Sequence, residues 1–258
     1  MRKNKILAVI GLRSGSKSIK NKNIKKLNGK PLFHYILRAA KKSKYINRIT
    51  VSTDSYKYKK IIIKYGGDCP YMRPKKYSKD NSDEILFIKD LLKKMKKNEN
   101  YIPDIIVRLL ATCPFQKSKD IDRAISLVLK NKYDSSVIIS KAQQHPEKAL
   151  RIVGNDKKYL TSYFGNNSVR VGSKLNRQQF KEAYFRSNVI VCKKKVINKF
   201  NSLSSNKPGY IKIPYQLDID TLDDFNFAKF KMSKKKINLV YQFKLKFFSV
   251  HKSSQLSY

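Results

Sequence analysis

The sequence is poor in the residues that build metal clusters and disulfide frameworks, with only three histidines and three cysteines among 258 residues. Cys69, Cys113 and Cys192 lie far apart, so neither a disulfide scaffold nor a cysteine-based metal site is indicated. No apolar run approaches the roughly eighteen residues needed to cross a bilayer. The apolar run after the basic segment 1–5 is too short for a signal peptide. We therefore expect a globular cytoplasmic protein with reduced thiols.

Acidic residues are also scarce. Asp and Glu number 18 against 58 Lys and Arg, which gives a formal net charge of +40. Such an excess is typical of proteins that bind polyanions, and a non-enzymatic polyanion-binding protein is one interpretation. However, lysine is spread along the whole chain, and no zinc-finger, helix-turn-helix or RNA-binding aromatic motif is present. The sequence therefore predicts no specific nucleic-acid partner.

Short apolar runs alternate with amphipathic segments through most of the chain. The patterns predict strands at 6–10, 48–53, 104–110, 135–140, 187–192 and 210–213, and helices at 31–42, 55–65, 85–95, 118–131, 193–200 and 221–231. This alternation predicts an α/β fold in which helices cover both faces of a mostly parallel sheet. The rhythm fails between 141 and 185, where we expect an inserted arm in a single domain spanning 1–231. No role is assigned to the basic tail, 232–258.

The loop at 11–23 follows the first apolar run directly and is rich in hydroxyl and ammonium groups. Backbone N–H groups and lysines at the end of a buried strand suit a polyphosphate. Gly11 to Ser18 nearly matches the P-loop of NTPases, but Ser16 replaces the second glycine and no helix follows at once. A nucleotide-binding loop, a P-loop-like NTPase or kinase, and a lysine-rich surface turn are therefore all open at this point.

A second candidate site lies at Asp218 and Asp220, just before the last predicted helix. On an extended segment, residues i and i+2 point to the same side, so these two carboxylates can reach one point. Mg²⁺ is commonly held by one or two carboxylates together with substrate phosphates. Alternatively, Asp220 only caps the helix. A phosphate loop combined with a carboxylate pair favours nucleotidyl transfer.

A set of motifs in this order resembles the cytidylyltransferases that make CMP-activated keto-acid sugars, such as CMP-N-acylneuraminate synthetases. The matching segments, which fall within about 5–230, are Arg13–Lys17 with Lys22 and Asn23, Leu27–Leu32, Val51–Asp54, Arg73–Pro74 with Asp80, Thr112–Phe115, His145–Pro146 with Lys148, Arg177–Gln179, Arg186–Asn188 and Asp218–Asp220. The resemblance implies a three-layer α/β/α Rossmann-like nucleotidyltransferase fold. It also implies that the arm is a dimerisation arm, and hence that the protein is a homodimer.

The implied reaction joins CTP to a sialic-acid-like keto-acid sugar through attack of the anomeric hydroxyl on the α-phosphate, with release of pyrophosphate. By resemblance, Arg13, Lys17 and Asp220 are catalytic. The nucleotide-binding residues would be Arg13, Ser14, Gly15, Ser16, Lys17, Lys22, Asn23, Arg73 and Asp80. The sugar would contact Lys148, Arg177, Gln178, Arg186 and Asn188, and Asp218 and Asp220 would hold Mg²⁺.

The chain departs from the family pattern at three places. Leu109 to Gln116 reads L-L-A-T-C-P-F-Q where the family usually has L-Q-P-T-S-P-L-R, so the glutamine and the arginine of that segment are absent. Ser18 replaces a common glycine, and the segment 186–189 lacks the final glycine of R-x-N-G. These differences leave open which keto-acid sugar is the substrate.

Overall fold

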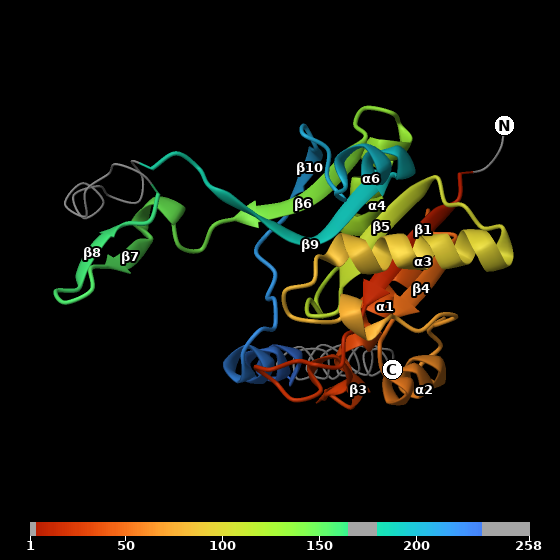
Figure 1. The fold of residues 1–258 in the computed structure, drawn as a ribbon, viewed down its shortest axis with the longest axis horizontal. Helices are drawn as coiled ribbons and strands as arrows, with labels where there is room; N and C mark the ends of the chain where they lie inside the picture. Colours follow the sequence, from red (N-terminus) through yellow and green to blue (C-terminus); the bar gives the residue numbers. More distant parts are fainter. Residues whose placement is uncertain (1–3, 165–179, 234–258) are drawn as a thin grey trace, which may run out of the picture.

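The central feature of the molecule is a six-stranded sheet, seen edge to edge in Figure 1. The computed structural model describes residues 4–164 and 180–233, so the tail and part of the predicted arm lie outside the described residues. The strand order is β10-β6-β9-β5-β1-β4. The strands are β1 (Ile6–Gly11), β4 (Arg48–Ser52), β5 (Ile105–Leu110), β6 (Ser135–Lys141), β9 (Tyr184–Lys193) and β10 (Gly209–Lys212).

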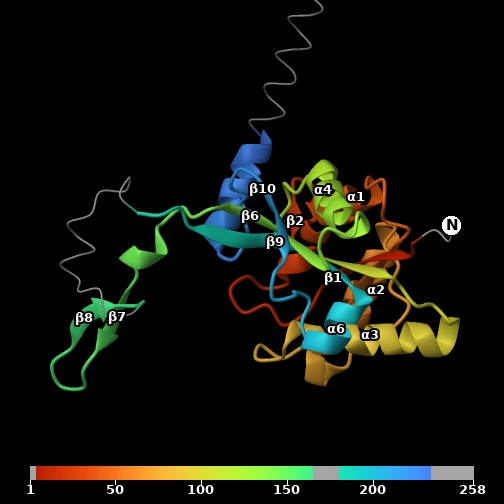
Figure 2. The same cartoon turned by 90° about the horizontal axis from the view of Figure 1, so that it is seen from above.

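Helices cover both faces of this sheet, as Figure 2 shows from above. One face carries α1 (Leu32–Lys41), α2 (Tyr56–Lys64) and α4 (Ser118–Leu129), and the other carries α3 (Glu84–Glu99) and α6 (Lys194–Phe200). Strand β1 is buried from both sides, which explains its unbroken apolar sequence. The predicted three-layer α/β/α fold is confirmed.

Of two predicted helix ends, the start of α2 agrees with the structure and the end of α3 does not. Ser55 caps α2, because its side chain accepts a hydrogen bond from the backbone N–H of Tyr58. Helix α3 runs four residues past its predicted end at residue 95, since nothing in its lysine-rich last turn stops it. It ends at Asn100, which adopts the left-handed conformation with φ 48°.

Strand β9 runs antiparallel to both of its neighbours, β5 and β6, although the other pairs in the sheet are parallel. The reason lies in the segment that precedes it. The chain leaves the sheet at the carboxyl end of β6, forms the insertion and returns at the same edge. It must therefore run back through the sheet in the opposite direction.

The insertion projects away from the body of the molecule at the left of Figure 1. Its described part contains the short helix η3 (Pro146–Lys148) and an antiparallel hairpin of β7 (Leu150–Val153) and β8 (Tyr159–Ser162). We call residues 141–164 and 180–185 the arm. Several of its apolar side chains are exposed, including Ile152 at 69%, Tyr159 at 62% and Leu160 at 52%.

Besides the apolar layers on the two faces of the sheet, a smaller apolar cluster joins the N-terminal and C-terminal parts of the described chain. Ile19, Leu27 and Leu32 from the N-terminal part pack with Leu217, Ile219 and Phe225 from the C-terminal part. The three N-terminal residues of this cluster lie in the segment that contains η1 (Lys22–Ile24) and the small hairpin of β2 (Lys26–Leu27) and β3 (Lys30–Pro31). This cluster brings the predicted phosphate loop next to the predicted carboxylate pair.

The last helix occupies residues 222–233 and begins with a capping box. The hydroxyl of Thr221 accepts a hydrogen bond from the Asp224 backbone N–H, and Asp224 accepts one from the Thr221 backbone N–H. No helix within 4–164 and 180–233 is long and apolar enough to span a membrane.

Candidate active site

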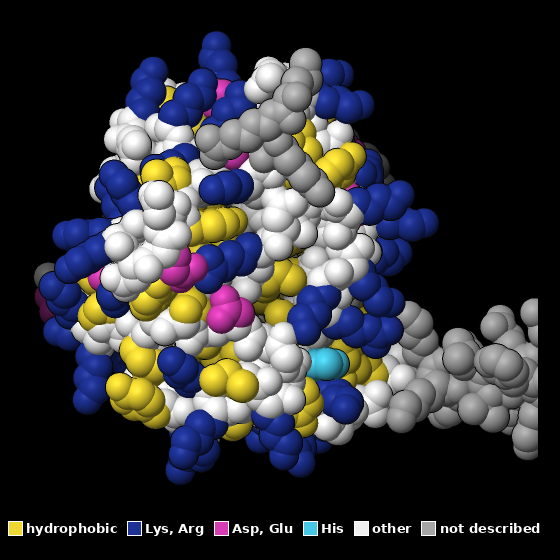
Figure 3. All heavy atoms as spheres, turned by 90° about the vertical axis from the view of Figure 1, so that its right-hand side faces the viewer, with side chains coloured by type: hydrophobic (Ala, Val, Ile, Leu, Met, Phe, Trp, Pro, Cys, Tyr) yellow, Lys and Arg dark blue, Asp and Glu magenta, His cyan; other side chains and the backbone are white. Residues whose placement is uncertain are grey.

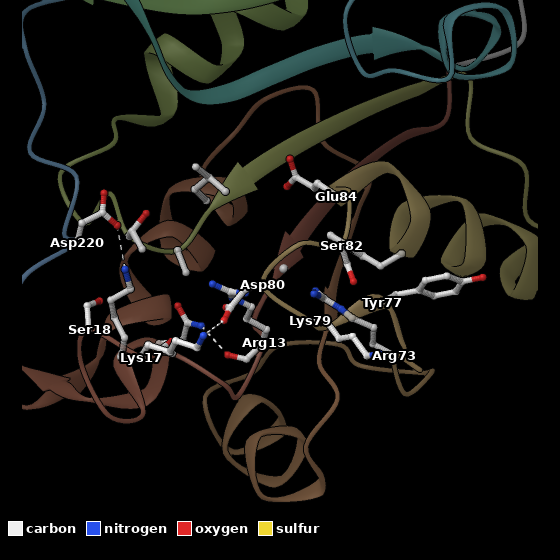
Figure 4. A pocket seen from close by; sticks show the side chains of 18 residues that line it. Arg13, Lys17, Ser18, Arg73, Tyr77, Lys79, Asp80, Ser82, Glu84 and Asp220 are labelled. Atoms are coloured by element: carbon white, nitrogen blue, oxygen red, sulfur yellow. Dashed lines mark hydrogen bonds and ion pairs between the residues drawn. The ribbon is translucent and has the colours of Figure 1, made fainter. Parts of the chain in front are cut away.

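A cavity of about 550 Å³ opens at the carboxyl ends of β1 and β5, where ligands bind in open parallel sheets. Figure 4 shows side chains from several distant segments pointing into it. Its lining residues are Gly11, Arg13, Ser16, Lys17, Ser18, Lys22, Asn23, Arg73, Tyr77, Lys79, Asp80, Ser82, Glu84, Phe87, Leu110, Ala111, Thr112 and Asp220. The structure thus places most of the predicted phosphate loop and one of the two predicted metal ligands around one cavity.

Two cations of the loop share a single carboxylate. Arg13 Nη1 lies 2.6 Å from Asp80 Oδ1, and Lys17 Nζ lies 2.7 Å from Asp80 Oδ2. Lys17 and then Arg13 hold the pKa of Asp80 below its ordinary value. All three groups are partly or largely exposed, so a polyphosphate can compete with Asp80 for the two cations.

Lys22 connects the first loop to the last segment of the domain. Its Nζ donates to the carbonyl oxygen of Ile219 at 2.9 Å and to Asp220 Oδ1 at 3.0 Å, 198 residues away in the sequence. Asn23 is buried and donates from Nδ2 to the carbonyl oxygen of Arg13 at 3.0 Å. Lys22 thus holds Asp220 at the cavity, whereas Asn23 fixes the backbone that carries Arg13.

Two predicted members of the loop face elsewhere. Ser14 donates from both its backbone N–H and its hydroxyl to the carboxylate of Asp54, at 2.9 and 2.8 Å. Neither Ser14 nor Gly15 is among the residues that line the cavity, whereas Ser16 is. Asp54 follows β4, so Ser14 anchors the loop to the neighbouring strand.

Arg73 is a buried cation at the inner end of the cavity. Its guanidinium stacks on the ring of Phe87 at 3.7 Å and donates to the hydroxyl and the carbonyl oxygen of Ser52. Burial lowers the pKa of Arg73 to about 10, so the side chain is protonated at neutral pH. Gly11 leaves the space for this arrangement, because a Cβ there would lie 2.9 Å from Arg73 Nη2 and 3.0 Å from Phe87 Cζ.

The carboxylates of Asp218 and Asp220 have different surroundings. Asp220 is exposed at the cavity, whereas Asp218 is not among the cavity-lining residues. Asp218 Oδ1 is buried without a hydrogen-bond partner. It lies near the Cys113 thiol, whose pKa is raised by burial and by this carboxylate. The unpaired carboxylate oxygen of Asp218 and the exposed carboxylate of Asp220 are both oxygen ligands of the kind that divalent cations prefer. The pair therefore fits a divalent cation.

The predicted sugar-binding residues are divided between the body and the arm. Asn188 is buried in β9, with its Nδ2 unpaired, and Arg186 lies exposed two residues before it. Lys148 lies on the arm, where its Nζ is 5.4 Å from the ring of Phe180. His145 stacks on the same ring at 4.6 Å. Arg177 and Gln178 lie outside the described residues.

Ten residues that line the cavity are not among the predicted site residues, and most of these come from the segment before α3, from α3 and from the end of β5. Tyr77, Lys79, Ser82 and Glu84 come from the segment before α3 and its first turn, Phe87 comes from α3, and Thr112 follows β5. In the sequence, a polar loop directly after a strand is the signal for a cavity-lining residue. Residues 75–83 follow an irregular segment instead, and no local periodicity indicates that this segment lies near β1. For Thr112 a signal was present, because Thr112–Phe115 is one of the segments that resemble the family.

The first loop does not have the context of a P-loop. After β1 the chain forms turns, η1 and the β2–β3 hairpin, and the first α-helix starts only at Leu32. In a P-loop the phosphates face the N-terminus of a helix that follows immediately. The structure therefore does not favour the P-loop NTPase interpretation.

The basic residues do not form one continuous stripe on the face shown in Figure 3, where Lys and Arg side chains are scattered among apolar and other side chains. Clustering on one face or along a helix is the electrostatic footprint expected of a nucleic-acid-binding surface. This distribution gives no specific support to the polyanion-binding alternative.

Comparison with known proteins agrees with the geometry of the cavity. A family model described as cytidylyltransferase matches residues 7–252. The chain is 28% identical over 237 residues to post-translational flagellin modification protein B of Campylobacter coli, covering 91% of this chain and 97% of that protein. It is 30% identical over 243 residues to N-acylneuraminate cytidylyltransferase of Escherichia coli O18:K1:H7, covering 92% of this chain but 55% of that enzyme.

Among solved structures, CMP:2-keto-3-deoxy-manno-octonic acid synthetase complexed with CTP has a similar fold. The TM-score is 0.65, and the similarity covers 90% of this chain and all of the other at 15% sequence identity. At that identity the likeness concerns the fold alone.

Proposed function

This chain belongs to the cytidylyltransferase family of nucleotidyltransferases, and from this premise we propose its reaction. CMP is transferred from CTP to the anomeric hydroxyl of a sialic-acid-like keto-acid sugar, and pyrophosphate is released. The product is a CMP-sugar of the kind used to build surface glycans. Because the reaction consumes CTP, we expect it to take place in the cytoplasm.

One observation carries the proposal. The phosphate loop after β1 and the acidic segment before the last helix meet at one cavity, where Lys22 Nζ lies 3.0 Å from Asp220 Oδ1. Nucleotidyl transfer needs cations for the triphosphate and carboxylates for a metal at the same place. Both requirements are met by segments from opposite ends of the domain.

The residues of the loop would act mainly by electrostatics. Negative charge builds on the phosphate oxygens as the sugar hydroxyl attacks and pyrophosphate departs, so positioned cations lower the barrier. We assign this role to Arg13 and Lys17, which exchange Asp80 for the triphosphate. Lys22 keeps Asp220 oriented, Ser16 faces the phosphates, and Ser14 and Gly15 shape the loop.

A magnesium ion fits the carboxylates of Asp218 and Asp220, given the unpaired Oδ1 of Asp218 and the exposed carboxylate of Asp220. When bound, Mg²⁺ polarises the α-phosphate and neutralises the leaving pyrophosphate. Arg73 lies on the nucleotide side of the cavity, where its contacts with Ser52 and Phe87 hold it in place.

We further infer that the active enzyme is a homodimer. The arm projects from the body (Figure 1), and Lys148, in η3 on this arm, is not among the cavity-lining residues. Exposed apolar side chains such as Ile152 and Leu160 need a partner surface. A second copy would cover them and allow Lys148, together with Arg177 and Gln178, to reach the acidic sugar beside Arg186 and Asn188.

The proposal is tested with purified protein, Mg²⁺ and a panel of nucleoside triphosphates and sugar acids, namely N-acetylneuraminic, legionaminic, pseudaminic and ketodeoxyoctonic acids. We expect pyrophosphate and a CMP-sugar only when CTP and one of these acids are both present. Folded protein without turnover on any pair would refute the proposal. Release of orthophosphate without a sugar would instead identify an NTPase.

A further inference from the structure

Arg108 is a charged residue in an otherwise apolar strand. It lies in the middle of β5, between Val107 and Leu109, and only 9% of its surface is exposed. Burying a guanidinium is costly unless hydrogen bonds and opposite charges compensate. Neither the predicted phosphate site nor the predicted metal site accounts for this residue.

The protein provides only part of that compensation. Arg108 Nε lies 3.1 Å from Glu84 Oε2, and Nη1 donates to the carbonyl oxygen of Asn188 at 3.2 Å. A guanidinium has five N–H groups. Within 4–164 and 180–233, the Nε group of Arg108 makes no hydrogen bond, although Glu84 lies within ion-pair distance of it.

Other groups around Arg108 connect the nucleotide cavity with the predicted sugar residues. Glu84 lines the cavity, and so does Leu110, which lies two residues further along β5 on the same face. On the other side, Asn188 is 1% exposed and its Nδ2 has no partner. The antiparallel register pairs Arg108 with Ile190, so Asn188 also presents its side chain on this face.

Arg108 lies among other charged groups at the inner part of the cavity. Glu84 interacts with two buried arginines, Arg73 and Arg108, and Arg186 adds a third cation close enough to lower the pKa of Arg108. Burial is the main cause of that lowering, and Asp218 opposes it. Three arginines thus lie in this region, and two buried N–H donors, Arg108 Nε and Asn188 Nδ2, make no hydrogen bond within the described residues. An acceptor-only group such as a substrate carboxylate matches both features.

Resting on the function proposed above, we propose that Arg108 is a substrate-binding residue that recognises the carboxylate of the sugar acid together with Asn188 Nδ2, and that Glu84 orients its guanidinium. The site would accept keto-acid sugars and discriminate against neutral sugars. Arg108 would thus supply a polar contact from β5, next to the segment where Leu110 and Ala111 replace the glutamine and proline of the family pattern.

The test uses Arg108→Lys, which keeps the charge but removes the planar fork, with Arg123→Lys on the exposed face of α4 as the matched control. We expect the KM for the sugar acid to rise about 10- to 100-fold, the range for a lost charge-assisted hydrogen bond. The Kd for CTP, measured by calorimetry without sugar, should change less than about twofold. An unchanged sugar KM, or an equal loss of CTP affinity, would overturn the proposal.

A second measurement separates recognition from a structural effect. The sugar acid is compared with its carboxamide in the wild-type enzyme and in Arg108→Lys. If Arg108 binds the carboxylate, replacing the acid by its carboxamide raises the KM strongly in the wild type. In Arg108→Lys the same replacement raises the KM much less, because the guanidinium that binds the carboxylate is already absent. Equal increases of the KM in both proteins would refute the assignment. Absence of turnover in the wild type on every acid would refute the proposed function itself.

Discussion

The cavity and the arm use their residues in opposite ways. Around the cavity, polar groups are tied to one another within a single chain, as in the pairs Arg13–Asp80 and Lys22–Asp220. On the arm, apolar side chains such as Ile152 and Tyr159 are exposed, and the hairpin packs mainly on itself. A single chain therefore completes the nucleotide half of the site but leaves its apolar arm uncovered. We therefore expect nucleotide binding to be a property of the single chain and, under the homodimer proposed above, sugar binding to depend on assembly.

The largest effect at the cavity is expected for Asp220→Asn. The substitution removes a carboxylate charge from the proposed metal site while keeping the shape of the side chain. We expect kcat to fall about 100- to 1,000-fold, the range for losing one group that stabilises developing charge. Pyrophosphate release at saturating CTP and sugar measures it.

Asp223→Asn is the matched control, because Asp223 is exposed in the first turn of the helix that follows Asp220 and does not line the cavity. It should retain full activity. If Asp220→Asn turned over as fast as this control, the proposed role of Asp220 would be wrong. Dimer formation should be unaffected in both variants.

The arm side is broken by the double substitution Ile152→Lys and Leu160→Lys. Placing two ammonium groups in an apolar interface should raise the dimer dissociation constant at least about 100-fold, since single interface anchors contribute about 2 kcal/mol or more. Analytical ultracentrifugation measures this change. The activity at low protein concentration should fall with it, while CTP affinity is retained.

Ile63→Lys serves as the control for the arm, because Ile63 is an apolar residue of α2 that is 56% exposed. It should leave association unchanged. A wild-type protein that sediments as a monomer at all concentrations would contradict the homodimer. So would a double variant that associates as tightly as the wild type.

Gly11→Ala tests how tightly the inner end of the cavity is packed. The new methyl group would press on Arg73 and Phe87, and overpacking of this kind costs about 1–3 kcal/mol of unfolding free energy. CTP affinity should also fall, because Arg73 is displaced. Chemical denaturation without nucleotide measures the first effect and calorimetry the second.

Gly15→Ala is the control for stability, because a Cβ at Gly15 would meet nothing within 4 Å. It should unfold at the same denaturant concentration as the wild type. Equal stability of the two variants would show that the contact between β1 and Arg73 is looser than the structure has it.

The smallest effect is expected for Asp80→Asn. Removing this carboxylate frees Arg13 and Lys17 for the triphosphate, so the Kd for CTP should fall by less than about fivefold, since exposed ion pairs are weak. The pKa of Asp80 is lowered by Lys17 and Arg13, so the ion pairs form above that pKa and are lost as the pH falls through it. The effect should therefore be constant from about pH 6 to 9.

Asp83→Asn is the control for Asp80→Asn, because Asp83 lies on the same loop. It should leave CTP affinity unchanged. Weaker CTP binding by Asp80→Asn, with normal binding by this control, would mean that Asp80 contacts the nucleotide directly and does not compete with it.

The fold was largely predictable because its signals are local. Strand β1 is an unbroken apolar run, and α1 and α4 carry apolar stripes whose residues are the buried ones. The capping box at Thr221 and Asp224 could be read directly from the sequence. The direction of β9 could not, because it depends on where the inserted arm leaves and re-enters the sheet.

The candidate site was only partly predictable for a similar reason. Arg13, Lys17, Lys22 and Asp220 were identified through their motifs, and the structure brings them to one cavity. The structure also revealed that Ser14 binds Asp54 and that Asp80 is shared by Arg13 and Lys17. These partners lie 40 to 67 residues apart, and their pairing is set by the packing of loops at the ends of different strands.

The sequence by itself determined the α/β alternation, the chemistry of the phosphate loop and the family to which the chain is similar, because each is written in consecutive residues. Only the tertiary structure decided which of these residues meet. The apolar cluster of Ile19, Leu27, Leu217 and Ile219 joins segments about two hundred residues apart, and so places Lys22 beside Asp220. Burial of apolar surface is non-directional, so no local pattern names its partners in advance.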